Sequence, residues 1–120
     1  MLGKQIKLSV IFLSIILILT SCGGKPNNVS ESAYNAGIRA IEIADDYLDY
    51  KISSEEAGKL IEEIENRKPF NTEEYIGDLD ISLNLTTLDF AVRNYLGYGE
   101  AEVLNARNGI AQVINKPERK

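Results

Sequence analysis

After residue 30, hydrophobic residues recur at three- and four-residue steps, which is the spacing of one face of an α-helix. The first helix is expected over residues 31–50, with a buried stripe of Tyr34, Ile38, Ile41, Ala44 or Asp45, and Leu48. A second helix begins after Ser53, because Ser53 and Glu56 have the spacing of a capping box. Its buried stripe consists of Ala57, Leu60, Ile61 and Ile64, and Pro69 ends it. Since Lys51 and Ile52 alone separate these two helices, they are predicted to pack antiparallel.

Residues 78–96 fit two patterns. Leu79, Ile81, Leu83 and Leu85 alternate as in a strand, whereas Ile81, Leu85, Leu88, Val92 and Tyr95 keep a helical period. The helix is preferred, because a single strand would leave both of its edges unpaired. The last helix covers residues 100–115, with Val103 or Leu104, Ala106, Ile110, and Val113 or Ile114 inside, and Pro117 follows it. The prediction is an all-α fold, a small four-helix bundle in a single domain over residues 31–118.

The first 21 residues have the three parts of an export signal. Residues 1–7 carry Lys4 and Lys7 and no acidic residue, residues 8–19 are almost entirely apolar, and the small Thr20 and Ser21 follow. An apolar run of roughly 12 residues is shorter than the ~20 needed to cross the hydrocarbon of a bilayer. The segment is therefore interpreted as a cleaved signal peptide, not as a membrane-spanning anchor.

Leu19, Thr20, Ser21 and Cys22 resemble the lipobox of bacterial lipoprotein precursors. The resemblance implies that the Cys22 thiol receives diacylglycerol and that a signal peptidase then cuts between Ser21 and Cys22. Cys22 is the only cysteine, so the folded part has no disulfide and no thiol nucleophile. Residues 22–30 are rich in Gly, Asn and Ser and are expected to form a flexible lipidated tether. The protein is then held at the extracytoplasmic face of the cell membrane, with the lipid as its only expected attached group.

The negative net charge of residues 22–120 limits which molecules the protein can bind. Residues 1–21 hold two of the 13 basic residues and none of the 18 acidic ones, so their removal leaves a net charge of −7. Such a domain is repelled by nucleic-acid phosphates and by anionic lipids, which argues against nucleic-acid binding. The sequence also contains no His, which removes the commonest general base and many zinc sites. A non-catalytic role is therefore expected.

Residues 45–56 resemble an EF-hand calcium loop, with Asp45, Asp49 and Glu56 at loop positions 1, 5 and 12. Calcium needs 6–8 oxygen ligands and a sharp turn at position 6, which is ordinarily made by Gly. Tyr50 stands at position 6 and resists a positive φ, and Tyr47 stands where a third ligand belongs. A helix that runs through Tyr50, followed by the capping box, explains the same residues without metal. No metal site is therefore assigned, and calcium binding is kept as the alternative function.

The hairpin over residues 41–57 is similar to small helical lipoproteins of Gram-positive bacteria and their mobile elements, a resemblance that implies no particular activity. The chain has six Tyr and no Trp, and Tyr is favoured at recognition surfaces. Tyr50 and Tyr98 lie beside predicted turns and are expected to form a partner surface. The leading hypothesis is a membrane-anchored module that binds another protein of the cell envelope, or an incoming phage or toxin component. The alternatives are an acidic calcium-binding lipoprotein and, third, a small hydrolase.

Attachment is predicted to depend on one thiol. We expect Cys22→Ser to leave the precursor uncut and to abolish labelling by a fatty-acid analogue, because both lipidation and the following cleavage require the Cys22 thiol. In-cell labelling followed by electrophoresis measures both effects. Equal labelling of the wild-type and Cys22→Ser proteins would contradict the lipoprotein interpretation.

Overall fold

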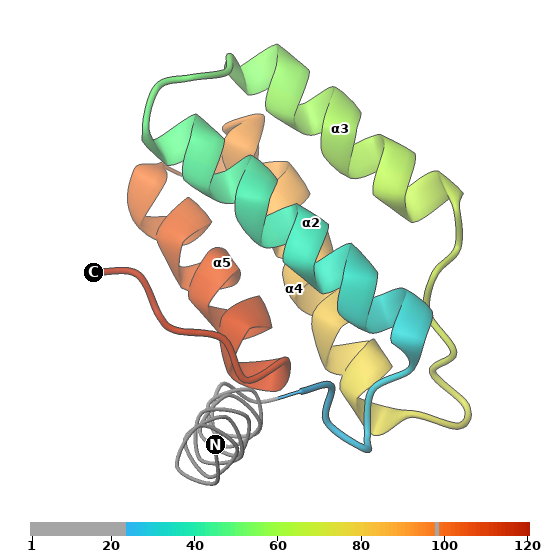
Figure 1. Cartoon of the computed structure of the whole chain (residues 1–120). Helices are drawn as coiled ribbons and strands as arrows, with labels where there is room; N and C mark the ends of the chain where they lie inside the picture. Colours follow the sequence, from blue (N-terminus) through green and yellow to red (C-terminus); the bar gives the residue numbers. More distant parts are fainter. Residues whose placement is uncertain (1–23, 98) are drawn as a thin grey trace, which may run out of the picture.

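The computed structural model describes residues 24–97 and 99–120 (Figure 1), so the predicted signal peptide with Ser21, as well as Cys22 and Tyr98, lie outside the described residues. Within this part the helices are α2 (Glu31–Leu48), α3 (Ser54–Asn66), α4 (Ile76–Val92) and α5 (Glu100–Val113), with a 3₁₀ turn, η1 (Tyr95–Gly97). The all-α bundle predicted from the sequence is confirmed. Among the described residues, no helix combines the length and the hydropathy needed to cross a membrane.

Each helix runs antiparallel to the next one along the chain. Figure 1 shows α3 returning beside α2, α4 passing behind α2, and α5 returning beside α4. The main interface joins α4 to α5, and α2 packs across both of them, while α3 contacts α2 and α4. The antiparallel pairing predicted for the first two helices is therefore confirmed.

The core draws side chains from every helix and from the segment before α2. Its largest fully buried apolar side chains are Val29, Ile43, Ile61, Ile81, Leu85, Leu88, Val92, Val103, Ile110 and Ile114. The stripes predicted for the last three helices agree with this set, except that Leu60 is half-buried and Tyr95 is exposed. Tyr95 lies outside the stripe because α4 ends at Val92, earlier than the period alone suggested.

The buried face of α2 differs from the prediction. It consists of Ala33, Ala36, Gly37, Ala40 and Ala44, with Ile43 as its one large member. A Cβ atom on Gly37 would lie 3.3 Å from side-chain carbons of Ile110 and Ile114, so α2 and α5 approach closely. The larger residues predicted for this stripe, Tyr34, Ile38, Ile41 and Leu48, pack against the core from its edge. Branched side chains from α5 fill the space between the helices and leave room for small residues at the centre of α2.

The four described helices all end with a residue in the left-handed region. These residues are Tyr50 (φ 60°), Lys68 (49°), Asn94 (56°) and Asn115 (57°). At the end of α2, the Tyr50 N–H donates to Tyr47 O (3.1 Å) and the Lys51 N–H donates to Asp46 O (2.8 Å). This is a Schellman cap, which satisfies carbonyls that the helix leaves unpaired. The prediction that the helix runs through Tyr50 and that Tyr50 avoids positive φ is therefore wrong.

Asp78 is fully buried in the first turn of α4 and joins three segments. Its Oδ1 accepts from the Ser30 N–H (2.8 Å), while Oδ2 accepts from the Ser30 hydroxyl (2.5 Å) and the Asn71 N–H (2.8 Å). Ser30 is also the N-cap of α2, and its hydroxyl oxygen accepts from the Ala33 N–H. One carboxylate therefore fixes the start of α2 and the loop before α4. A negative charge at this helix terminus is also favoured by the α4 dipole.

The end of the predicted tether is part of the fold. Val29 is fully buried, and Asn28 O accepts a hydrogen bond from the Gly77 N–H (2.9 Å). A Cβ atom on Gly77 would lie 2.6 Å from a Val29 methyl carbon and 2.7 Å from Asn28 O, so this approach requires glycine. The expectation that all of residues 22–30 form a flexible tether is corrected, because Val29 adds apolar burial to the core.

We expect Asp78→Ala to destabilise the fold by about 2–4 kcal/mol, because two backbone N–H groups and one hydroxyl lose their acceptor in a buried site. For a domain of this size that lowers the melting temperature by on the order of 10–20 °C. Thermal unfolding followed by circular dichroism measures the change. Asp80→Ala is the matched control, because Asp80 is exposed on the same helix. Equal effects of the two substitutions would contradict the role given to Asp78.

Candidate functional site

The acidic turn after α2 is held by arginine side chains. Arg107 of α5 binds Asp45 through both carboxylate oxygens, with Nε–Oδ1 and Nη2–Oδ2 distances of 3.0 and 3.2 Å. Arg119, near the C-terminus, donates to Asp45 (3.4 Å) and to Asp49 (2.6 Å). The hydrogen bond from Arg119 lowers the pKa of Asp49. Glu56 is exposed at the start of α3, where its backbone N–H donates to the Ser53 hydroxyl.

In this geometry, two of the carboxylates that would bind calcium at the turn already have partners. The positive φ of Tyr50 is the one feature that a calcium loop would share. Two of the three candidate ligands, Asp45 and Asp49, instead neutralise arginines. Within residues 24–97 and 99–120, no group of three or more Asp or Glu side chains is arranged to hold a metal ion. The turn therefore works as a structural ion-pair cluster in this arrangement.

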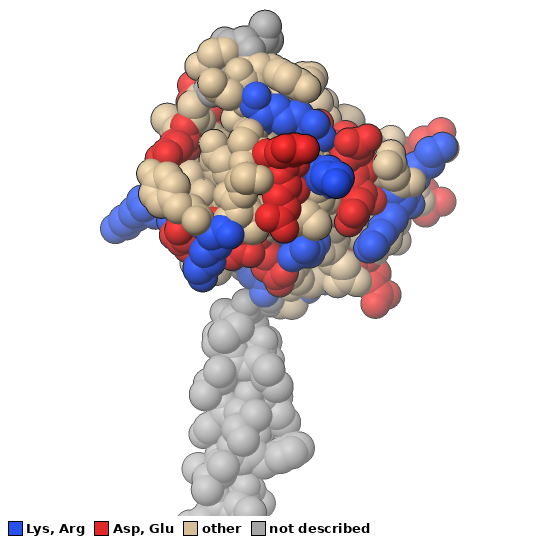
Figure 2. Space-filling model, turned by 90° about the horizontal axis from the view of Figure 1, so that it is seen from above, with Lys and Arg blue, Asp and Glu red and all other residues tan. Residues whose placement is uncertain are grey.

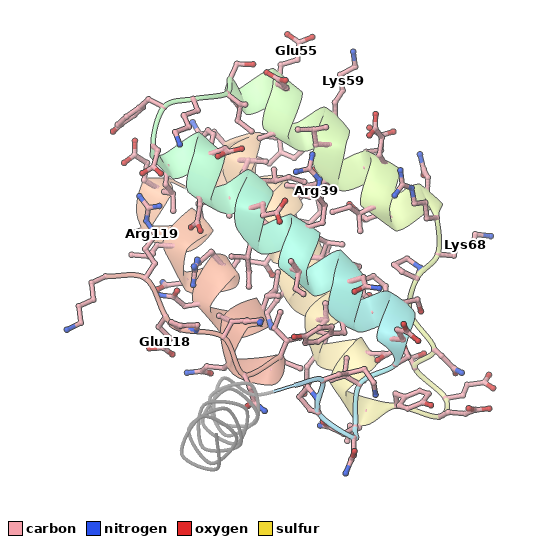
Figure 3. The ribbon with its side chains drawn as sticks, in the orientation of Figure 1. Arg39, Glu55, Lys59, Lys68, Glu118 and Arg119 are labelled. Carbon is pink, nitrogen blue, oxygen red and sulfur yellow. The ribbon has the colours of Figure 1, made fainter. Side chains whose placement is uncertain are left out.

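The C-terminal segment folds back along α5. The Asn108 side chain accepts from the Arg119 N–H (2.8 Å) and donates to Arg119 O (2.8 Å), and Arg107 donates to Pro117 O (2.7 Å). Gln112 donates to the Glu118 carboxylate (2.6 Å). Figure 3 shows Arg119 brought by this path to the side of α2. These bonds explain how a cation from the end of the chain reaches the acidic turn.

Tyr50 is 80% exposed, as expected, but its hydroxyl is engaged. It donates to the Glu100 carboxylate (3.0 Å) at the start of α5, and this bond raises the pKa of Tyr50. The ring therefore bridges the α2–α3 turn and α5 while one face remains open. Tyr98, the second residue of the predicted partner surface, lies outside the described residues.

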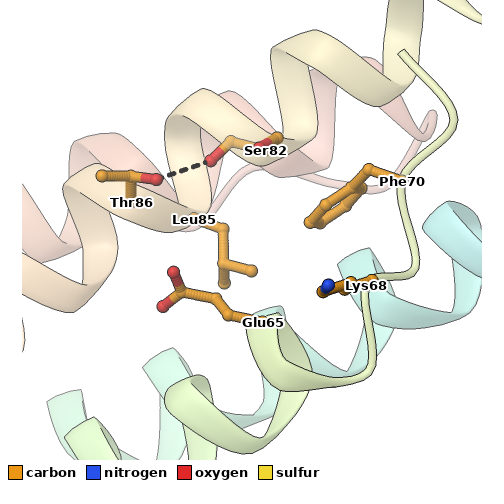
Figure 4. A pocket seen from close by; sticks show the side chains of 6 residues that line it. All are labelled: Glu65, Lys68, Phe70, Ser82, Leu85 and Thr86. Atoms are coloured by element: carbon orange, nitrogen blue, oxygen red, sulfur yellow. Dashed lines mark hydrogen bonds between the residues drawn. The ribbon is translucent and has the colours of Figure 1, made fainter.

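A pocket of about 350 Å³ lies between α3 and α4 (Figure 4). Its lining residues are Glu65, Lys68, Phe70, Ser82, Leu85 and Thr86. Figure 4 shows Glu65, Leu85 and Phe70 around the opening, with the Thr86 hydroxyl donating to Ser82 O (3.1 Å). The pocket offers one carboxylate and one ammonium group for a small polar ligand, without a nucleophile activated by a neighbouring base.

Carboxylates from α3 and α4 meet behind this pocket. Partial burial raises the pKa of Glu65, and the neighbouring charge of Asp89 raises it further. Arg93 donates to Asp89 (2.7 Å), to Glu62 (3.2 Å) and to Gly58 O (2.8 Å). The cluster joins α3 to α4 at their solvent-facing edge. The raised pKa of Glu65 is the one feature that it shares with catalytic carboxyl groups.

The outward side of α4 carries a second apolar stripe. We define the α4 outer face as Ile76, Leu79, Leu83 and Phe90, which are 69%, 44%, 58% and 41% exposed. Their spacing of three, four and seven residues places them on one side of the helix. The opposite side carries the buried Ile81, Leu85, Leu88 and Val92. At its far end, the Phe90 ring lies 6.0 Å from the exposed Tyr95 ring, centroid to centroid.

Polar residues beside this face direct their hydrogen bonds back to their own helix. The Asn84 side chain donates to Asp80 O (2.9 Å), and the Thr86 and Thr87 hydroxyls donate to Ser82 O and Leu83 O (3.1 Å each). Such bonds satisfy the side-chain donors within the helix and leave the threonine methyl groups outward. No Lys, Arg, Asp or Glu occurs between Asp80 and Asp89. By contrast, Figure 2 shows acidic and basic side chains interspersed over another face of the bundle.

The α4 outer face was missed in the choice of partner residues from the sequence, although a signal for it was present. Leu79 and Leu83 alternated with the helical stripe as in a strand, and Ile76 and Phe90 also fell outside that stripe. A helix that is apolar on two sides needs a neighbour on both. No protein-family model matches this chain, and neither the curated proteins nor the solved structures compared with it gave a match.

We expect Glu65→Gln to stabilise the fold at pH 7 and to have no effect below pH 4. Because folding raises the pKa of Glu65, the folded state favours the protonated side chain. The stability that depends on this protonated form is lost as the pH rises through the folded pKa. Melting temperatures measured from pH 3 to pH 8 test this. Glu63→Gln, at an exposed position on the same helix, controls for the loss of one negative charge. A benefit of Glu65→Gln that is equal at all pH values would contradict the assignment.

Proposed function

We propose that this protein is a lipid-anchored module on the extracytoplasmic face of a bacterial cell membrane, which works by binding protein through the α4 outer face. The observation that carries the proposal is this face itself. Ile76, Leu79 and Leu83 expose large apolar side chains along a regular helix, while α4 is otherwise built into the core. Apolar side chains at positions i, i+3 and i+7 of an exposed helix face are the anchors that helices use to bind a groove or another helix.

The anchor is proposed from the sequence at Leu19–Cys22, and the first described residues show where it would join the fold. Val29 is seated against the first turn of α4, and Lys25 donates to Val29 O (2.6 Å). Four Cα–Cα steps separate Cys22 from Pro26, which span at most about 15 Å. A lipid on Cys22 would therefore hold the α4 N-terminus close to the bilayer.

A binding role agrees better with the described side chains than catalysis or calcium binding does. The carboxylates best placed for catalysis or calcium binding already have partners. Arginines bind Asp45, Asp49 and Asp89, and Glu65 interacts with Asp89. On the α4 outer face, by contrast, Ile76, Leu79 and Leu83 remain 69%, 44% and 58% exposed. Binding through this face needs no cofactor.

We expect the double substitution Leu79→Gln with Leu83→Gln to abolish protein adducts formed by in-cell chemical crosslinking of the anchored chain. Both leucines are exposed, and Gln has a helix propensity close to that of Leu, so stability should change by no more than about 1 kcal/mol. Glu55→Gln with Glu63→Gln on the exposed side of α3 is the control pair and should keep the adducts. An unchanged adduct pattern in the leucine variant, with the melting temperature preserved, would refute the role of this face.

A further inference from the structure

We infer that the partner of the α4 outer face is a second copy of this chain, anchored in the same bilayer, with the two α4 helices parallel. The inference rests on the proposed function, because it names the partner of that face. It is carried by three features: the spacing of the exposed residues, the charges that border them, and the place where the anchored segment meets the fold.

The exposed residues follow the seam of a two-stranded coiled coil. Ile76, Leu83 and Phe90 are seven residues apart, and Leu79 falls at the intermediate position. In a seven-residue repeat these are positions a and d, with Ile at the first a and Leu at the first d, a combination that favours two parallel strands. Thr86 takes the second d position, with its hydroxyl bonded to its own helix. In a parallel pair each a residue meets the same residue of the second copy.

The bordering charges are complementary in this arrangement. Tyr75 precedes Ile76 and therefore takes a g position, while Asp80 takes the following e position. In a parallel pair, Tyr75 of one copy lies opposite Asp80 of the other. The Lys25 ammonium lies 6.0 Å from the centre of the Tyr75 ring. The Lys25 ammonium donates to Val29 O and Pro26 O of its own chain, which holds its positive charge at this border, on the side that faces Asp80 of the other copy in a parallel pair. Asp89, at the g position before Phe90, is paired with Arg93, and the exposed Glu73 and Glu74 lie in the loop before Tyr75.

The attachment point selects the parallel orientation. Asn28 and Val29 are docked at Gly77, so the anchored end of each copy lies beside the first residue of the α4 outer face. Figure 1 shows residues 24–30 passing beneath the first turns of α2 and α4. Two copies held by short chains in one bilayer present this end of α4 to the membrane together. An antiparallel pair with upright helices would carry one of its anchors to the far end of the bundle, away from that bilayer.

The small area of the α4 outer face explains why the two copies must share a membrane to pair. Fourteen residues of helix rise about 21 Å, and a strip about 10 Å wide covers on the order of 200 Å² per copy. Stable interfaces bury about 800 Å² per partner, so the pair is weak when the chains diffuse freely. Tethering two chains to one surface raises their effective concentration by the same principle as a linker. The dimer is therefore a property of the anchored protein.

Cysteine crosslinking of the full chain in membranes tests the inference. Ile76→Cys and Leu83→Cys, made separately, should each give a covalent dimer under mild oxidation, at ~10-fold or higher yield than Glu63→Cys. Glu63 is exposed on α3, and the wild-type chain, whose Cys22 thiol is blocked by the lipid in this proposal, gives the background. Dilution of the membranes into detergent before oxidation should remove the dimer. The charge variant Asp80→Lys should lower the Leu83→Cys yield, and adding Lys25→Glu should restore it.

Each other outcome is decisive. A Leu83→Cys yield no greater than that of Glu63→Cys overturns the inference. A Leu83→Cys dimer without an Ile76→Cys dimer is the signature of antiparallel helices and overturns the parallel arrangement. Adducts at Leu83→Cys that contain a different protein, with no dimer, overturn the second copy as partner and leave the proposed function standing. Absence of any adduct at Ile76 and Leu83 overturns the second copy as partner, and the in-cell chemical crosslinking of the Leu79→Gln with Leu83→Gln variant then decides the proposed function.

Discussion

The buried carboxylate of Asp78 is the constraint on which the arrangement of the bundle depends. It accepts from two backbone N–H groups and one hydroxyl, at Ser30 and Asn71, from inside the first turn of α4. Because the Asp78 carboxylate is fully buried, its removal would leave the Ser30 and Asn71 N–H groups without this acceptor at the junction of the segments. The same contact aligns the N-termini of α2 and α4 and sets Val29 over Gly77. It therefore also determines where residues 24–28 leave the fold.

A second set of contacts ties the opposite ends of the helices together. Arg107 and Arg119 converge on Asp45 and Asp49 from α5 and from the C-terminal segment. This convergence turns the most metal-like stretch of the sequence into an ion-pair cluster, in which arginine nitrogens surround the carboxylate oxygens that calcium would require. Exposed ion pairs contribute little individually, but Arg107 is largely buried and binds Asp45 through two bonds.

These two constraints leave α4 with a side that the bundle does not cover. Its inward residues fill the core between α2 and α5, while Ile76, Leu79, Leu83 and Phe90 face outward. In a protein of modest size such exposure costs solubility unless another apolar surface covers it. The proposed binding role and the proposed parallel pair both follow from this uncovered side, and an anchor at Cys22, as proposed, would limit which orientation a second copy can take.

The sequence by itself determined the helices, their order and most of the core, because a 3.6-residue period and local capping signals such as Ser53 with Glu56 act over a few residues. It also indicated the export signal and Cys22 by a local pattern. The tertiary structure decided what depends on distant residues. Small residues lie at the centre of α2 because Ile110 and Ile114 occupy the space opposite. Tyr50 takes a positive φ because the end of the helix is capped there. Asp45 and Asp49 bind arginines 62 and 70 residues further along the chain, a pairing that no local pattern encodes.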